Sequence, residues 1–128
     1  MLNDINGRGY DTMTKKEFDT IAIDFDGVLN KYKGYKGETE LYEPLEGAKQ
    51  FLSYLNLKAK NVIIYTSRDR GPVINWLYKY ELAVYVKAVY QKPKAEIYID
   101  DRAVTFNGEY GETLKKIKNF KPWWSDKE

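Results

Sequence analysis

The chain has 128 residues, of which 43% are apolar and 31% are charged, and its formal net charge is +2. This length fits one compact domain, and so small a net charge argues neither for nor against a nucleic-acid partner. The sequence has no Cys and no His, which excludes disulfides, thiolate chemistry, histidine bases and histidine metal sites. Any catalysis must therefore use carboxylates, hydroxyls, Lys, Arg or a metal ion bound by oxygen.

The sequence also lacks membrane and secretion signals. No apolar run approaches the roughly 18 to 20 residues that span a bilayer, and the first residues, MLNDINGRGYDTMTKKEFD, have no apolar core of a signal peptide. We expect a cytoplasmic protein without a membrane partner, in which a loose leader (residues 1 to 16) precedes a single domain (residues 17 to 128). The oligomeric state is left open.

The first half of the chain predicts two buried strands with a helix between them. Residues 20 to 23 and 61 to 65 are short apolar runs typical of buried parallel strands, and Gly27 follows the first. Residues 31 to 42 (KYKGYKGETELY) predict a surface loop or hairpin. Pro44 suits the first turn of a helix, along which apolar residues then recur at helical spacing: Leu45, Ala48, Phe51, Leu52 and Leu55.

The second half continues the alternation of helices and strands. Gly71 and Pro72 start a helix, residues 82 to 90 hold a third strand, and residues 95 to 99 form a fourth strand that ends at Asp100. A last helix covers about residues 111 to 119. Such alternation predicts an α/β fold with an open, mostly parallel sheet covered by helices on both faces.

Polar side chains follow three of these strands. In open α/β sheets, ligands bind beyond the carboxyl ends of the strands. The residues found there are Asp24 and Asp26 after the first strand, Thr66 and Ser67 after the second, and Asp100 and Asp101 after the fourth, which Lys92 and Lys94 precede.

This set of side chains matches the needs of phosphoryl transfer. A Mg²⁺ ion held by one or two carboxylates offsets the charge of the phosphate, and a Lys adds a second positive charge. A small hydroxyl can hold the phosphoryl oxygens. One carboxylate can then attack phosphorus, while a second carboxyl group protonates the leaving oxygen.

The same residues resemble the motifs of the haloacid dehalogenase (HAD) superfamily. Residues 21 to 29 (IAIDFDGVL) resemble its first motif, a hydrophobic strand followed by Asp-x-Asp-Gly, and residues 63 to 68 (IIYTSR) resemble the second. Lys92-Pro93 resembles the third motif, and residues 97 to 101 (IYIDD) resemble the acidic fourth motif. The four occur in the right order over about residues 20 to 106.

The resemblance implies a role for each residue. Asp24 would be the nucleophile and a Mg²⁺ ligand, and Asp26 the general acid/base with its main-chain carbonyl on the metal. Thr66 would bind the phosphoryl group, and Lys92 would pair with Asp24 and the phosphate. Asp100 would hold the metal directly, and Asp101 would support it. Further candidates for substrate binding are Gly27, Ser67, Arg68 and Lys94.

The gaps between the motifs resemble those of the capless type of this superfamily. Residues 31 to 43 hold only a flap, and residues 69 to 91 hold one helix and a strand. The implied fold is a three-layer α/β/α sandwich with a Rossmann-like sheet and an open site. Substrates of such proteins range from nucleotides to phosphorylated ends of nucleic acid. Residues of the flap would border the entrance: Lys31, Tyr32, Lys33, Tyr35 and Lys36.

Several alternatives stay open. Thr66 could simply cap the turn after its strand, which would leave Ser67 to bind phosphate. Lys94 competes with Lys92, Arg68 could be a surface residue, and Asp101 could lie outside the metal's ligand set. The predicted function is a Mg²⁺-dependent phosphomonoesterase with an aspartyl-phosphate intermediate, acting on a nucleotide, another phosphate ester or a nucleic-acid end. The alternative is a binding or regulatory protein that keeps the fold without turnover.

Overall fold

The computed structural model describes residues 16 to 125 of the chain. It divides into two compact units, Met1–Lys92 and Pro93–Glu128. Apart from Lys16, the predicted leader lies outside the described residues. No helix in residues 16 to 125 is long and apolar enough to cross a lipid bilayer.

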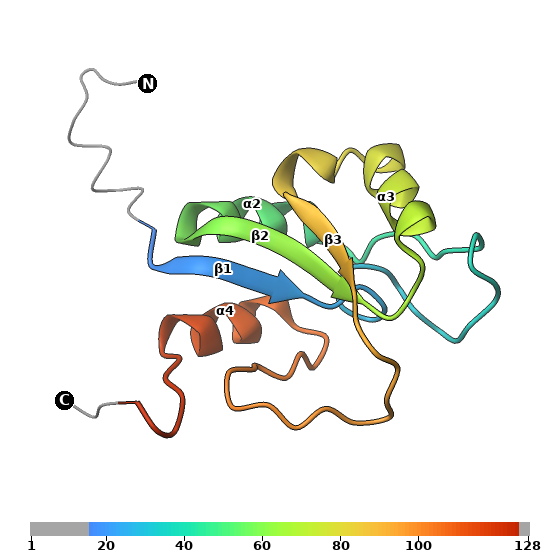
Figure 1. Ribbon diagram of the computed structural model, residues 1–128. Coiled ribbons are helices and arrows are strands. Elements are labelled where there is room, and N and C mark those ends of the chain that lie inside the picture. Colours follow the sequence, from blue (N-terminus) through green and yellow to red (C-terminus); the bar gives the residue numbers. More distant parts are fainter. Residues whose placement is uncertain (1–15, 126–128) are drawn as a thin grey trace, which may run out of the picture. The chain divides into compact units, whose positions relative to one another are not determined.

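A parallel sheet forms the centre of the first unit (Figure 1). Its strands are β1 (Phe18–Ile23), β2 (Ala59–Thr66) and β3 (Ala88–Gln91), in the order β1-β2-β3. Helix α2 (Ala48–Lys58) connects β1 to β2, and helix α3 (Arg70–Lys79) lies between β2 and β3. The prediction of an α/β fold with a parallel sheet is therefore confirmed for this unit.

The two faces of the sheet differ in burial. Ile23 pairs with Ile64, which pairs with Val89, and all three side chains are buried. On the opposite face, Tyr65 pairs with Tyr90 and both rings are exposed. One face thus packs into the core of the first unit, because strand side chains alternate between the two faces of a sheet.

The helix predicted from Pro44 begins later than expected. Pro44 pairs with Asn30 in an isolated antiparallel bridge, and the Leu45 N–H donates to the Leu29 carbonyl at 2.8 Å. These contacts hold the segment extended, so α2 starts only at Ala48, after Gly47 with φ of 91°. A positive φ is readily adopted by Gly alone, so Gly47 marks the change of direction.

The flap, defined as residues 31 to 43, is a loop without helix or ladder, as predicted. Its two ends meet, because the Lys31 N–H donates to the Glu43 carbonyl at 2.8 Å. The segment that follows α3 agrees with the prediction only in part. A short 3₁₀ helix, η1 (Ala83–Tyr85), leads into β3, so the strand fills only the end of the predicted range.

The second unit contains helix α4 (Tyr110–Lys118), close to the predicted position. The predicted fourth strand is wrong, because residues 95 to 99 form no strand and Ile97 and Ile99 are 75% and 97% exposed. A strand needs a neighbour to accept and donate its main-chain hydrogen bonds. The described residues of the second unit contain no other strand that could serve as this neighbour.

Candidate active site

The carboxyl ends of the three strands bring together residues that are far apart in the sequence. Asp24 follows β1, Thr66 ends β2, and Lys92 follows β3. The Lys92 N–H donates to the Thr66 carbonyl at 2.8 Å, and the Lys92 Nζ lies 3.6 Å from Asp24 Oδ1. Three predicted site residues therefore meet at one edge of the first unit.

Asp24 is partly withdrawn from water. Its side chain is 43% exposed, and its Oδ1 accepts a hydrogen bond from the Phe25 N–H at 2.8 Å. Burial raises the pKa of Asp24 above its ordinary value, the nearby Asp26 adds to the rise, and the Phe25 N–H and Lys92 oppose it. A carboxylate that is partly buried and still accessible to solvent is suited to bind a cation or attack an electrophile.

Asp26 is held more firmly than Asp24. The Arg68 Nε donates to both of its carboxylate oxygens, at 2.9 and 2.8 Å, and the Asn30 Nδ2 donates to Oδ1 at 3.2 Å. Asn30 is fully buried, and its own Oδ1 accepts the Gly27 N–H at 2.9 Å. Gly27 has φ of 77°, a conformation that Gly adopts without strain, so this glycine shapes the turn that carries Asp26.

The two hydroxyl candidates lie in different environments. The Thr66 side chain is 0% exposed, and its Oγ1 accepts the Arg68 N–H at 3.1 Å. Thr66 therefore stabilises the turn after β2, as the structural alternative predicted. Ser67 is partly exposed, which makes its hydroxyl the more accessible of the two to a ligand.

The two lysine candidates separate as well. Lys92 forms the ion pair with Asp24, and its Nζ also lies 5.5 Å from the centre of the Tyr65 ring. Lys94 belongs to the second unit and is exposed. Within the first unit, Lys92 is thus the lysine that the fold brings to the candidate nucleophile.

Arg68 is not the surface residue that one alternative expected. Its side chain is 3% exposed and, besides Asp26, its Nη1 donates to the Gly37 carbonyl of the flap at 3.3 Å. Sequence reasoning missed this partnership, and it also missed Asn30. Asn30 could have been recognised as a polar residue four positions after Asp26 in an apolar context, since a buried amide needs hydrogen-bond partners.

Asp100 and Asp101 lie in the second unit. The Asp100 Oδ1 accepts the Arg102 N–H at 2.9 Å, which closes a local turn. Asp101 accepts a hydrogen bond from the Trp124 indole N–H, and this bond is the main reason that its pKa lies below the ordinary value. Both carboxylates are exposed.

The donors in the first unit suit a hard cation. Across residues 16 to 125, no group of three or more acidic side chains is gathered as a metal site. Mg²⁺, however, usually takes only one or two carboxylates from a protein, with water and substrate phosphate completing its octahedron. Asp24, at the end of β1, supplies one such carboxylate, whereas the Asp26 carboxylate is paired with Arg68 and leaves only its main-chain carbonyl for a metal ion.

Comparison with known proteins gives no relative. No family model, curated protein or solved structure matches the chain. The likeness to the HAD superfamily therefore rests on the motifs themselves, and the activity that it implies is a proposal.

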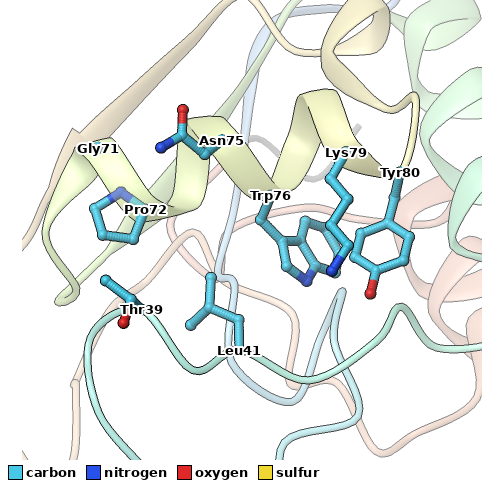
Figure 2. Close-up of a pocket in the computed structure, with 8 residues that line it drawn as sticks. All are labelled: Thr39, Leu41, Gly71, Pro72, Asn75, Trp76, Lys79 and Tyr80. Carbon is cyan, nitrogen blue, oxygen red and sulfur yellow. The ribbon is translucent and has the colours of Figure 1, made fainter.

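A pocket of about 330 Å³ lies between the flap and α3. Figure 2 shows the rings of Trp76 and Tyr80 next to each other, with Leu41 and Thr39 of the flap opposite α3. The two ring centres are 5.1 Å apart. None of the predicted site residues lines this pocket, so we assign no chemistry to it.

Proposed function

We propose that the chain is a Mg²⁺-dependent phosphomonoesterase of the capless HAD type. The observation that carries the proposal is the Asp24–Lys92 ion pair, with 3.6 Å between the charged atoms. It joins the residues predicted as nucleophile and phosphate-binding lysine, which are 68 positions apart in the sequence. A cation beside a carboxylate lets that carboxylate approach a negatively charged phosphate.

In the proposed reaction, a carboxylate oxygen of Asp24 attacks phosphorus, and the bond between phosphorus and the leaving oxygen breaks. Asp26 gives its proton to that oxygen, so that an alcohol departs. Asp26 then takes a proton from water, which attacks the aspartyl-phosphate and releases inorganic phosphate and free Asp24. Lys92 balances the charge of the phosphoryl group throughout.

The ligands proposed for Mg²⁺ within the first unit are Asp24 and the main-chain carbonyl of Asp26. When bound, the ion supplies positive charge to the phosphoryl oxygens. Ser67 is the accessible hydroxyl for those oxygens, whereas Thr66 holds the turn.

The proposed substrate is a nucleotide or another phosphate monoester, and an open site also admits a phosphorylated nucleic-acid end. Purified protein should hydrolyse an aryl phosphate with Mg²⁺ and lose this activity with EDTA. Asp24→Asn should lower kcat by about 10³-fold or more, because the covalent step needs a carboxylate. Full activity in Asp24→Asn would refute the mechanism, and an inactive wild type on a broad phosphate panel would favour a binding protein.

Competition separates the two substrate classes. A single-stranded oligonucleotide with a terminal phosphate should inhibit turnover more strongly than a nucleotide if the nucleic-acid end is the substrate. That inhibition should weaken steeply as salt rises, since phosphate contacts release counterions. Equal inhibition by both compounds, independent of salt, would favour the small phosphate ester.

A further inference from the structure

The tip of the flap is fastened to the turn after β2. The Arg68 Nη1 donates to the Gly37 carbonyl, and the Asp69 N–H donates to the Glu38 carboxylate, each at 3.3 Å. Two flap rings also lie near the guanidinium: its Cζ is 5.9 Å from the centre of the Tyr32 ring and 5.4 Å from that of Tyr35. Both distances are within the range of cation–π attraction.

The same guanidinium holds Asp26. Its Nε–H is shared by both carboxylate oxygens of Asp26, in an ion pair whose arginine is 3% exposed. One side chain therefore touches the candidate general acid with one nitrogen and the flap with another. Since the pair is largely screened from water, it fixes the orientation of the Asp26 carboxyl group more tightly than an exposed pair would.

A third nitrogen of Arg68 has no acceptor. Its Nη2 is buried and has no hydrogen-bond partner among the described residues. Buried polar groups are nearly always hydrogen-bonded, so an exception calls for a reason. The Arg68 side chain bonds Asp26 and the flap at the same time and lies under the Tyr32 and Tyr35 rings. This position leaves its Nη2 without an acceptor.

We propose that Arg68 is a positioning residue that holds the Asp26 carboxyl group and the flap in one arrangement, so that a seated flap is required to aim Asp26. This inference rests on the proposed function, in which Asp26 protonates the leaving group. Misplacing a catalytic group by about 1 Å can cost roughly 10²-fold in rate. The flap thereby acts on the proton-transfer step through Arg68.

The leaving group provides the test. An alkyl phosphate needs the proton from Asp26, whereas an aryl phosphate with an acidic phenol needs it much less. In a single turnover, Arg68→Gln should therefore slow release of the leaving group by about 10²-fold for the alkyl phosphate and by less than about fivefold for the activated aryl phosphate. Release of the leaving group is the step to compare, because the later hydrolysis of the aspartyl-phosphate is the same for both substrates. Asp26→Asn should show the same selectivity, and Arg68→Gln should add little to it.

Trypsin provides a readout that does not depend on activity. Lys33 and Lys36 in the flap are exposed, and their cleavage should become several-fold faster in Arg68→Gln. The matched control is Arg70→Gln, because the Arg70 Nε donates to the Val89 carbonyl and contacts neither Asp26 nor the flap in the hydrogen bonds of the structure. If Arg68→Gln does not fold, Arg68→Lys, which keeps the charge, replaces it in both assays.

The possible outcomes distinguish the positioning role of Arg68 from the proposed phosphatase function. Selective loss on the alkyl phosphate with faster flap cleavage supports the inference. Equal losses on both substrates, or flap cleavage unchanged from wild type, overturn it even if the enzyme is active. A wild type without phosphatase activity refutes the proposed function instead, and the cleavage assay then decides by itself whether Arg68 holds the flap.

Discussion

Two acidic pairs in this chain look alike in sequence and differ in structure. IAIDFD (residues 21 to 26) and IYIDD (residues 97 to 101) are both apolar runs that end in two carboxylates. The first run is a paired strand, and its carboxylates meet Lys92, Arg68 and Asn30. The second is an exposed segment without strand pairing, and its carboxylates meet neighbours in a local turn and Trp124.

The difference teaches that strand pairing, more than the apolar run, creates the environment of a site. Pairing with β2 fixes the end of β1, so that cations from later in the chain can be placed beside its carboxylates. A segment without a partner strand leaves its carboxylates in water, where ion pairs contribute little.

Substitution of the two candidate lysines should change kcat by very different amounts. Lys92→Met removes the cation beside Asp24 and should lower kcat by about 10²-fold or more, since charge stabilisation at a reacting group is a large part of catalysis. Lys94→Met, in the second unit, should leave kcat close to that of the wild type. Steady-state kinetics on one aryl phosphate gives kcat for both variants. A larger loss of kcat in Lys94→Met than in Lys92→Met would show that Lys94 is the catalytic lysine.

Loss of the two arginine–aspartate ion pairs should lower the free energy of unfolding by different amounts. Arg68→Met leaves the Asp26 carboxylate without its buried partner and should lower the free energy of unfolding by about 3 kcal/mol. Arg102→Met breaks an exposed pair, 3.8 Å from Asp101, and should cause no measurable change. Urea denaturation of both variants gives the comparison. Recovery of stability in the double variant Asp26→Asn, Arg68→Met would confirm that the cost lies in the unpaired charge.

Asp24→Asn should change stability in a manner that depends on pH. Burial raises the pKa of Asp24 above its ordinary 3.8, so the folded protein binds this proton more tightly than the unfolded chain does. The contribution of Asp24 to stability is therefore fully present below pH 3.8 and is lost as the pH rises through its folded pKa. Near pH 7 without divalent cations, Asn should raise Tm slightly, and the gain should vanish toward pH 3.

The control for that experiment is Asp19→Asn, which removes one negative charge from an exposed position on β1. A variant Asp24→Asn that is less stable than the wild type at neutral pH would contradict the account. It would show that the ion pair with Lys92 outweighs the loss of hydration.

The smallest effect concerns the second unit. The Trp124 indole N–H lowers the pKa of Asp101, so Trp124→Phe should return this pKa toward 3.8, as followed by NMR titration of the carboxyl group. The associated stability is present above pH 3.8 and lost in acid, and it is small because the pair is exposed. Trp123→Phe, at an exposed ring without this bond, is the control, and an equal shift there would remove Trp124 as the cause.

The sequence predicted the parts of the fold that depend on local pattern. The two buried strands, α3, α4 and the flap lie close to where apolar periodicity and turn residues placed them. The late start of α2 was missed because it depends on the bridge between Asn30 and Pro44, a contact that no local pattern reveals. The failed fourth strand has the same origin, since a strand depends on its partner.

The candidate site was also predicted only in part. Asp24 and Thr66 were predicted from their places at strand ends and Lys92 from its place before the predicted fourth strand, and the first unit brings the three together. The turn-capping role of Thr66 was one of the alternatives that the sequence left open, but the contacts of the Arg68 side chain with Asp26 and the flap were not foreseen. Such contacts form only when distant loops meet, so single-sequence patterns carry no trace of them.

Reductive trapping tests the central claim most directly. Borohydride reduces an acyl phosphate to an alcohol, so enzyme quenched during turnover with Mg²⁺ should contain homoserine at position 24, detected by mass spectrometry of the peptide. Omission of substrate, or Asp24→Asn, should abolish the product. Homoserine at position 24 would identify Asp24 as the nucleophile, whereas reduction at Asp26 or Asp100, or at no residue of an active enzyme, would rule out an aspartyl-phosphate at Asp24.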